Sequence, residues 1–153
     1  MAAPTKVPQS LPGLRKKVKR ITAAYSVDVA ECGFVFMVSD GAEGAGSGYT
    51  VTLPTMANAG AGWNCKIVNN APAAGSLNNS ADEDVRITTG DGNNAIAFVG
   101  HHGTTIAAVS DLAAQFIDLQ DDSVRGSYVE IWTDGKFWYA NGAAAVANAL
   151  ETA

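Results

Sequence analysis

Short apolar runs, each stopped by turn-forming residues, recur along this chain of 153 residues from Ile21 onward. Gly, Asn, Asp and Pro interrupt the runs about every eight to twelve residues, a spacing typical of all-β domains. Runs of that length suit strands and leave little room for amphipathic helices. The pattern therefore predicts a single β domain over residues 21–142, built as an antiparallel sandwich or a small, jelly-roll-like barrel.

The expected strands cover 24–30, 33–41, 49–54, 63–70, 84–92, 94–100, 104–110 and 114–120, with a closing hairpin at 128–142. Segments 56–64 and 110–115 have room for no more than a helical turn each, and glycines weaken the first. The Ala-rich segment 143–153 contains good helix formers. It is expected to form either a short helix or a frayed tail.

The closing hairpin, "YVEIWTDGKFWYANG", is unusually aromatic. Asp134-Gly135 favours a two-residue type I′ turn, which would place Ile131 opposite Trp138. Both faces of the ribbon then carry large apolar groups, and both must be covered, by the core of the chain or by another copy. The aromatic residues assigned to core or oligomer interface are Trp63, Tyr128, Trp132, Phe137, Trp138 and Tyr139.

Charge is divided unevenly along the chain. The first twenty residues hold six basic residues and no acidic one, whereas the remainder holds four basic and fifteen acidic ones. Pro4, Pro8 and Pro12 oppose a helix, so residues 1–20 are expected to form an extended arm or, alternatively, a plain disordered tail. The arm residues expected to bind a partner are Lys6, Leu11, Leu14, Arg15, Lys16, Lys17, Lys19 and Arg20.

The arm favours an acidic protein surface as its partner. Nucleic acid is disfavoured, because no aromatic residue interleaves the basic cluster and the acidic body would repel phosphates. Charged residues make up only 16% of the chain, against about 25% in an average domain. Such a surface suits a protein packed against its neighbours.

Motifs for catalysis, metals, cofactors or membranes are missing from the sequence. Cys32 and Cys65 do not make a disulfide framework. His101 and His102, flanked by Gly100 and Gly103, are expected in a turn, and on a strand they would point to opposite faces, away from a shared metal. No nucleophile elbow or phosphate loop occurs. Asp28 and Glu31 interrupt the apolar stretch after the arm, which excludes it as a membrane span or secretory signal. A non-enzymatic protein without cofactor or metal is expected.

Two stretches, 47–70 and 126–142, resemble β-rich structural modules in virions of tailed bacteriophages, found in head decoration (cement) proteins and in tail fibres or spikes. The resemblance covers about residues 47–142. The matching positions are Thr52-Leu53-Pro54, Gly60, Gly62, Ile67-Val68-Asn69, Val85-Arg86-Ile87, Gly90-Asp91, Gly126, Val129, Ile131, Asp134-Gly135 and Trp138-Tyr139. These motif positions are structural, so no catalytic residue carries over.

The resemblance implies a virion component, commonly a homotrimer, made in the host cytoplasm. The leading expectation is a capsid decoration protein that trimerises on the capsid surface and bridges neighbouring subunits of the major capsid protein. The absence of a long fibre repeat favours this assignment. The alternative is a receptor- or glycan-binding module of a tail fibre or spike, in which exposed aromatic rings would stack on sugars.

Overall fold

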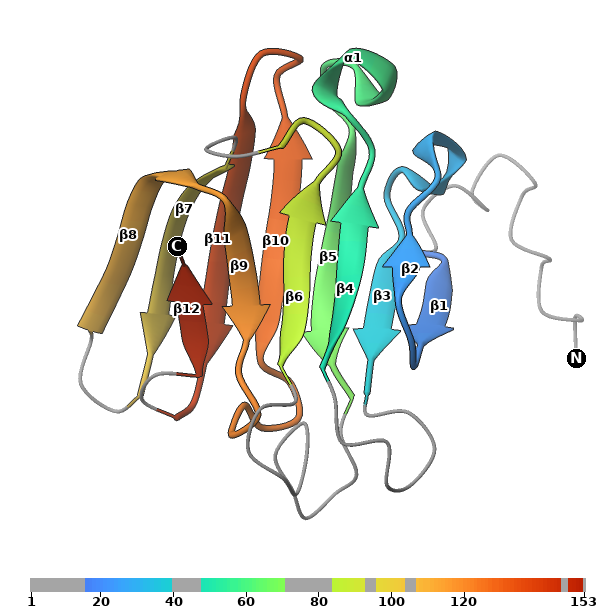
Figure 1. The fold of residues 1–153 in the computed structure, drawn as a ribbon. Coiled ribbons are helices and arrows are strands. Elements are labelled where there is room, and N and C mark those ends of the chain that lie inside the picture. Colours follow the sequence, from blue (N-terminus) through green and yellow to red (C-terminus); the bar gives the residue numbers. More distant parts are fainter. Residues whose placement is uncertain are drawn as a thin grey trace, which may run out of the picture.

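Two β-sheets pack face to face in the computed structural model, which describes residues 16–39, 48–70, 84–92, 96–103, 107–146 and 149–152 (Figure 1). The larger sheet has the order β1 (Val18–Ile21), β3 (Val35–Val38), β5 (Asn64–Asn69), β10 (Tyr128–Thr133), β11 (Trp138–Ala144), β7 (Ile96–His102) and β8 (Ala107–Ala114). The smaller sheet has the order β12 (Leu150–Thr152), β9 (Phe116–Leu119), β6 (Val85–Thr89), β4 (Tyr49–Leu53) and β2 (Tyr25–Ser26). The prediction of an all-β sandwich is confirmed.

The sheets are mixed, however, and not purely antiparallel. The first seven strands alternate between the two sheets, so that β1, β3 and β5 lie side by side and run parallel, as do β2, β4 and β6. The short segments between these seven strands cross from one sheet to the other, and are not hairpin turns within one sheet. A parallel pair needs a long crossover, and here the crossover contains a strand of the opposite sheet.

Alternation along the strands builds the core. Inward-facing side chains from both sheets are almost completely buried, with Trp138, Phe36 and Phe98 the largest of them. Trp63 and Trp138 meet edge to face, with ring centroids 5.5 Å apart and planes at 89°. Aromatic pairs of this geometry add about 0.5–1.5 kcal/mol beyond their buried area. Trp63 and Trp138 are therefore core residues.

Two glycines make room for one of the core rings. Gly100 and Gly142 are paired across β7 and β11 on the inward face. A Cβ on Gly100 would come within 2.5 Å of the Phe98 ring, and one on Gly142 within 2.8 Å of the Tyr128 carbonyl oxygen. Glycine inside a strand permits this close approach.

The hairpin register differs by two residues from the prediction. Ile131 pairs with Ala140 and Thr133 with Trp138, which leaves the four-residue loop 134–137. The Asp134 carboxylate accepts hydrogen bonds from the backbone N–H groups of Lys136 and Phe137, both at 2.8 Å. These bonds stabilise the longer loop. A shift of two residues keeps every side chain on its predicted face.

Two other segments depart from expectation. Of the strand predicted over 24–30, only β2 forms, and the 3₁₀ turn η2 (Val29–Glu31) follows it, because the Asp28 side chain accepts a hydrogen bond from the Ala30 N–H. The C-terminal segment forms β12, and its described residues, 143–146 and 149–152, contain no helix: Leu150 enters the core, and its strand pairs with β9. Burial and sheet pairing outweigh the helix propensity of alanine. The short helix α1 (Met56–Ala59) occupies the first place expected for a helical turn, whereas 110–114 belongs to β8.

Replacing Trp138 by Ala should lower the free energy of unfolding by about 3–5 kcal/mol, because it opens a cavity in the core. The matched change Trp132→Ala, on the outer face of the same hairpin, should cost less than about 1 kcal/mol. Urea denaturation of the two variants measures both values. Equal losses would contradict the assignment of the two faces.

Candidate interaction surfaces

The basic segment enters the fold at a sheet edge. Val18, Lys19 and Arg20 belong to the edge strand β1, which pairs with β3, and the Lys17 carbonyl accepts a hydrogen bond from the Val35 N–H at 2.8 Å. The last residues predicted for the arm are thus part of the larger sheet. Lys16 precedes β1 and is exposed. Lys6, Leu11, Leu14 and Arg15 lie outside the described residues.

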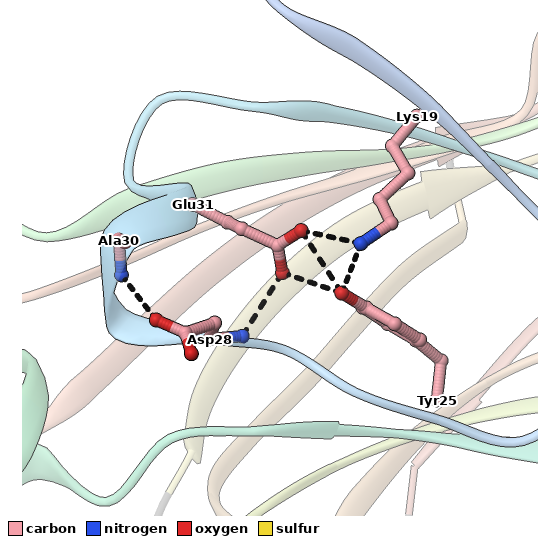
Figure 2. Close-up of polar contacts among 5 residues, drawn as sticks. All are labelled: Lys19, Tyr25, Asp28, Ala30 and Glu31. Carbon is pink, nitrogen blue, oxygen red and sulfur yellow. Dashed lines mark hydrogen bonds and ion pairs between the residues drawn. The ribbon is translucent and has the colours of Figure 1, made fainter.

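The Lys19 side chain is 39% exposed, but its ammonium group is held by the body of the domain (Figure 2). Its Nζ lies 2.6 Å from Oε1 of Glu31 and also donates to the hydroxyl of Tyr25. The Tyr25 hydroxyl in turn donates to the Glu31 carboxylate at 2.8 Å. The Lys19 ammonium also lies over the Tyr25 ring, 4.2 Å from its centroid. We call Lys19, Tyr25 and Glu31 the arm-root cluster.

Local structure positions Glu31 for this role. Asp28 caps the turn η2, and the Glu31 carboxylate accepts the Asp28 backbone N–H at 2.9 Å, which completes a capping box. Sequence reasoning missed Glu31 as a functional residue. The motif Asp-x-x-Glu at 28–31 was the available signal for the capping box, although it did not reveal the pairing with Lys19.

The cluster changes the pKa values of both charged partners. Burial acts to raise the pKa of Glu31, but hydrogen bonds from Lys19, from the Asp28 backbone and from Tyr25 outweigh it, and the net pKa lies below the ordinary 4.5. The hydrogen bond to Glu31 raises the pKa of Lys19 above its ordinary 10.5. The Lys19–Glu31 ion pair is therefore complete between pH values of about 4.5 and 10.5.

The outer face of the larger sheet is the second candidate surface. Val18, Val99 and Trp132 project from it with exposed fractions of 63%, 50% and 41%. Phe137, in the hairpin loop, is 59% exposed and packs edge to face against Tyr139. Tyr128 and Tyr139 lie on the same face, half-buried. The hairpin thus contributes Trp138 to the core and Tyr128, Trp132 and Tyr139 to an outer surface.

Neighbouring strands of that face differ in character. The outward residues of β11 and β7, together with Phe137, carry no carboxylate, lysine or arginine, although His101 lies at one end of the set, opposite Ala143. We call the others the uncharged strip: Ala97, Val99, Phe137, Tyr139, Asn141 and Ala143. On β5 and β10, by contrast, Lys66 and Glu130 form an ion pair at 2.9 Å.

The outer face of the smaller sheet is polar. Thr50, Thr52 and Thr88 point outward from β4 and β6. Arg86 makes a two-pronged hydrogen bond to Asp118, with distances of 3.0 and 2.8 Å, and its guanidinium covers the Phe116 ring. The hydrogen bond to Asp118 raises the pKa of Arg86. The two outer faces are therefore chemically unlike.

The described residues offer little for catalysis or metal binding. They contain no group of three His, Cys, Asp or Glu side chains placed to hold a metal ion, and no helix long and apolar enough to cross a membrane. Both cysteines are free thiols: Cys32 is exposed, and burial raises the pKa of Cys65.

The geometry thus provides a rooted basic segment and two unlike outer faces. No protein-family model, curated protein or solved structure matches this chain. Its residues alone carry the functional argument.

Acid should loosen β1. Because the folded-state pKa of Glu31 is depressed, its contribution to stability is present above the ordinary value of 4.5 and disappears as the pH falls through the folded value. Amide protection factors of Lys19 and Ile21, whose N–H groups face β3, should fall roughly tenfold as the Glu31 carboxylate becomes protonated, as measured by NMR hydrogen exchange. In Glu31→Gln the protection should be low at neutral pH and should not decline further in acid. An acid response preserved in Glu31→Gln would contradict this assignment.

Proposed function

We propose that this chain is a non-enzymatic structural protein of a bacteriophage virion, specifically a capsid decoration protein that bridges neighbouring subunits of the major capsid protein. The observation that carries the proposal is the attachment of the basic segment to the body through the arm-root cluster. A segment rich in lysine and arginine joins an acidic body at one sheet edge, where its Lys19 forms an ion pair with Glu31. A capsid subunit with an acidic surface is the partner that such a segment fits.

The arrangement supports attachment in a defined direction. Lys16 and Lys17 are exposed beside the fixed strand β1, so the residues before them start from a known point and face of the body. Fixing the base of a binding segment lowers the entropy lost when it docks. Repetition over a capsid multiplies weak contacts into a large total stabilisation. Stabilisation of the head against internal pressure would follow.

The uncharged strip supports self-association. A three-fold arrangement would bring this strip of each copy into contact with a neighbouring copy and remove Val99 and Phe137 from water. The polar outer face of the smaller sheet would remain in solvent. We propose a homotrimer on this basis.

Removing residues 1–15 should abolish attachment to heads and leave the body folded, because β1 and the arm-root cluster remain. Phage heads stripped of the protein are incubated with the full chain or with the chain that begins at Lys16, and bound protein is measured by sedimentation. Binding of the full chain should also weaken as salt rises.

Charge reversal tests the two exposed lysines beside β1, with Lys136→Glu as the control. Lys16→Glu combined with Lys17→Glu should reduce head binding, whereas Lys136→Glu in the hairpin loop should not. Unchanged binding by the truncated chain would refute the role of the arm. Cryo-electron microscopy that places the protein on the tail would refute the decoration function itself.

Replacing Val99 by Glu should convert the trimer to monomer, because it introduces a charge into the uncharged strip. Thr52→Glu, on the outer face of the smaller sheet, is the matched control and should leave the trimer intact. Sedimentation-velocity ultracentrifugation over a micromolar concentration series reports the mass. A wild-type chain that remains monomeric throughout would overturn the trimer proposal.

A further inference from the structure

Three tryptophans occur in the chain, and two of them are fully accounted for by the core. The indole N–H of Trp63 donates to the Val29 carbonyl at 2.9 Å, and that of Trp138 donates to the Asp91 carboxylate at 3.0 Å. Trp132 differs from them in its burial and in the hydrogen bonding of its indole N–H. It is 41% exposed, and within the described part of the chain its N–H donates to no protein atom.

The Trp132 ring is nevertheless held in place. On one side it stacks on Tyr139, with centroids 6.0 Å apart and planes at 19°. On the other side its partner across the strands is Asn64. There the indole lines a groove of about 150 Å³, whose other lining residues include Lys16, Phe34, Asn64, Lys66 and Glu130.

The polar groups of this groove are fixed by neighbours. Lys66 Nζ lies 2.9 Å from Oε1 of Glu130 and 3.6 Å from the centroid of the Tyr128 ring. The side-chain amide of Asn64 donates to the Gly62 carbonyl at 3.0 Å. The groove therefore presents an aromatic surface, a cationic donor and a carboxylate acceptor that are held by their neighbours. Preorganised groups of this kind lose little entropy on binding.

A pyranose ring matches this combination. Its C–H face is apolar and suits an indole, while its hydroxyl groups both donate and accept hydrogen bonds. The volume is below the range of about 300–1,000 Å³ found for drug-sized ligands, so the groove accommodates one small ring and not a large cofactor. A nucleic-acid base also stacks on tryptophan, and Lys16 and Lys66 would attract the accompanying phosphate while Glu130 repels it, so a nucleotide is the competing occupant for the test.

We propose that the groove beside Trp132 binds a single pyranose ring of a glycan, stacked on the indole and hydrogen-bonded by Glu130, Lys66 and Asn64. The groove is lined mainly by residues of β5 and β10, together with Lys16 and Phe34. It borders the uncharged strip, because Tyr139 of the strip supports the Trp132 ring. The inference goes beyond capsid attachment, and its test uses no capsid.

An NMR titration tests the proposal. The full-length ¹⁵N-labelled protein is titrated with the methyl β-glycosides of glucose, galactose and N-acetylglucosamine, and the three indole N–H signals are followed. At least one glycoside should shift the Trp132 signal, with an affinity of about millimolar for a single ring, while the Trp63 and Trp138 signals stay in place. No shift of the Trp132 signal with any of the three would overturn the proposal.

Variants separate stacking from general effects on the surface. Trp132→Ala should weaken binding at least about tenfold, Trp132→Phe should retain part of it, and Glu130→Gln should weaken it without removing the stack. Val99→Ala, on the same sheet face outside the groove, should bind as the wild type does. Undiminished binding by Trp132→Ala would sink the idea.

Two competing occupants are tested in the same experiment. A larger shift of the Trp132 signal with adenosine monophosphate than with any glycoside would assign the groove to nucleotides and overturn the proposal. Broadening of that signal with protein concentration alone, together with a rise in sedimenting mass that Trp132→Ala abolishes, would assign the groove to a second copy and likewise overturn it.

Discussion

The fold depends on burying the inner faces of two sheets against each other. Trp138, Phe36 and Phe98 have no exposed surface, and the edge-to-face contact of Trp63 with Trp138 lies within this layer. Because the inner faces are committed to the core, whatever the protein binds must use the outer faces, the sheet edges or the loops. This division explains why the hairpin 128–142 contains both a core tryptophan and an exposed one.

Electrostatics adds direction to that scaffold. Lys19 is neutralised by Glu31 inside a cluster that also engages Tyr25, so the basic segment joins the body at a fixed place. The two outer faces then divide the remaining chemistry. One carries threonines and the Arg86–Asp118 pair, and the other carries aromatic and uncharged groups beside the Lys66–Glu130 pair. A protein with such unlike faces is suited to oriented packing in an assembly.

Local sequence patterns predicted where strands form and which of their residues face inward or outward. They predicted less well which strands pair with one another. Alternation in 128–142 correctly separates Val129 and Ile131 from Trp132, because side-chain direction is a property of one strand. Which strands pair is decided by long-range packing, so the parallel neighbours and the hairpin register were not predictable in this way. The strand β12 was missed because burial of Leu150 is invisible in an Ala-rich tail.

The candidate surfaces were predictable only in part. The aromatic residues were found, but their division between core and surface needed the packing of the second sheet, because both hairpin faces are apolar. The pairing of Lys19 with Glu31 depends on the course of the chain through β2 and η2, which no local pattern specifies.

The alternating course of the strands also bears on biosynthesis. The central strand β5 meets β10 only after the ribosome has made residues 128–133, so a nascent chain must carry an unpaired apolar strand edge until that point of synthesis.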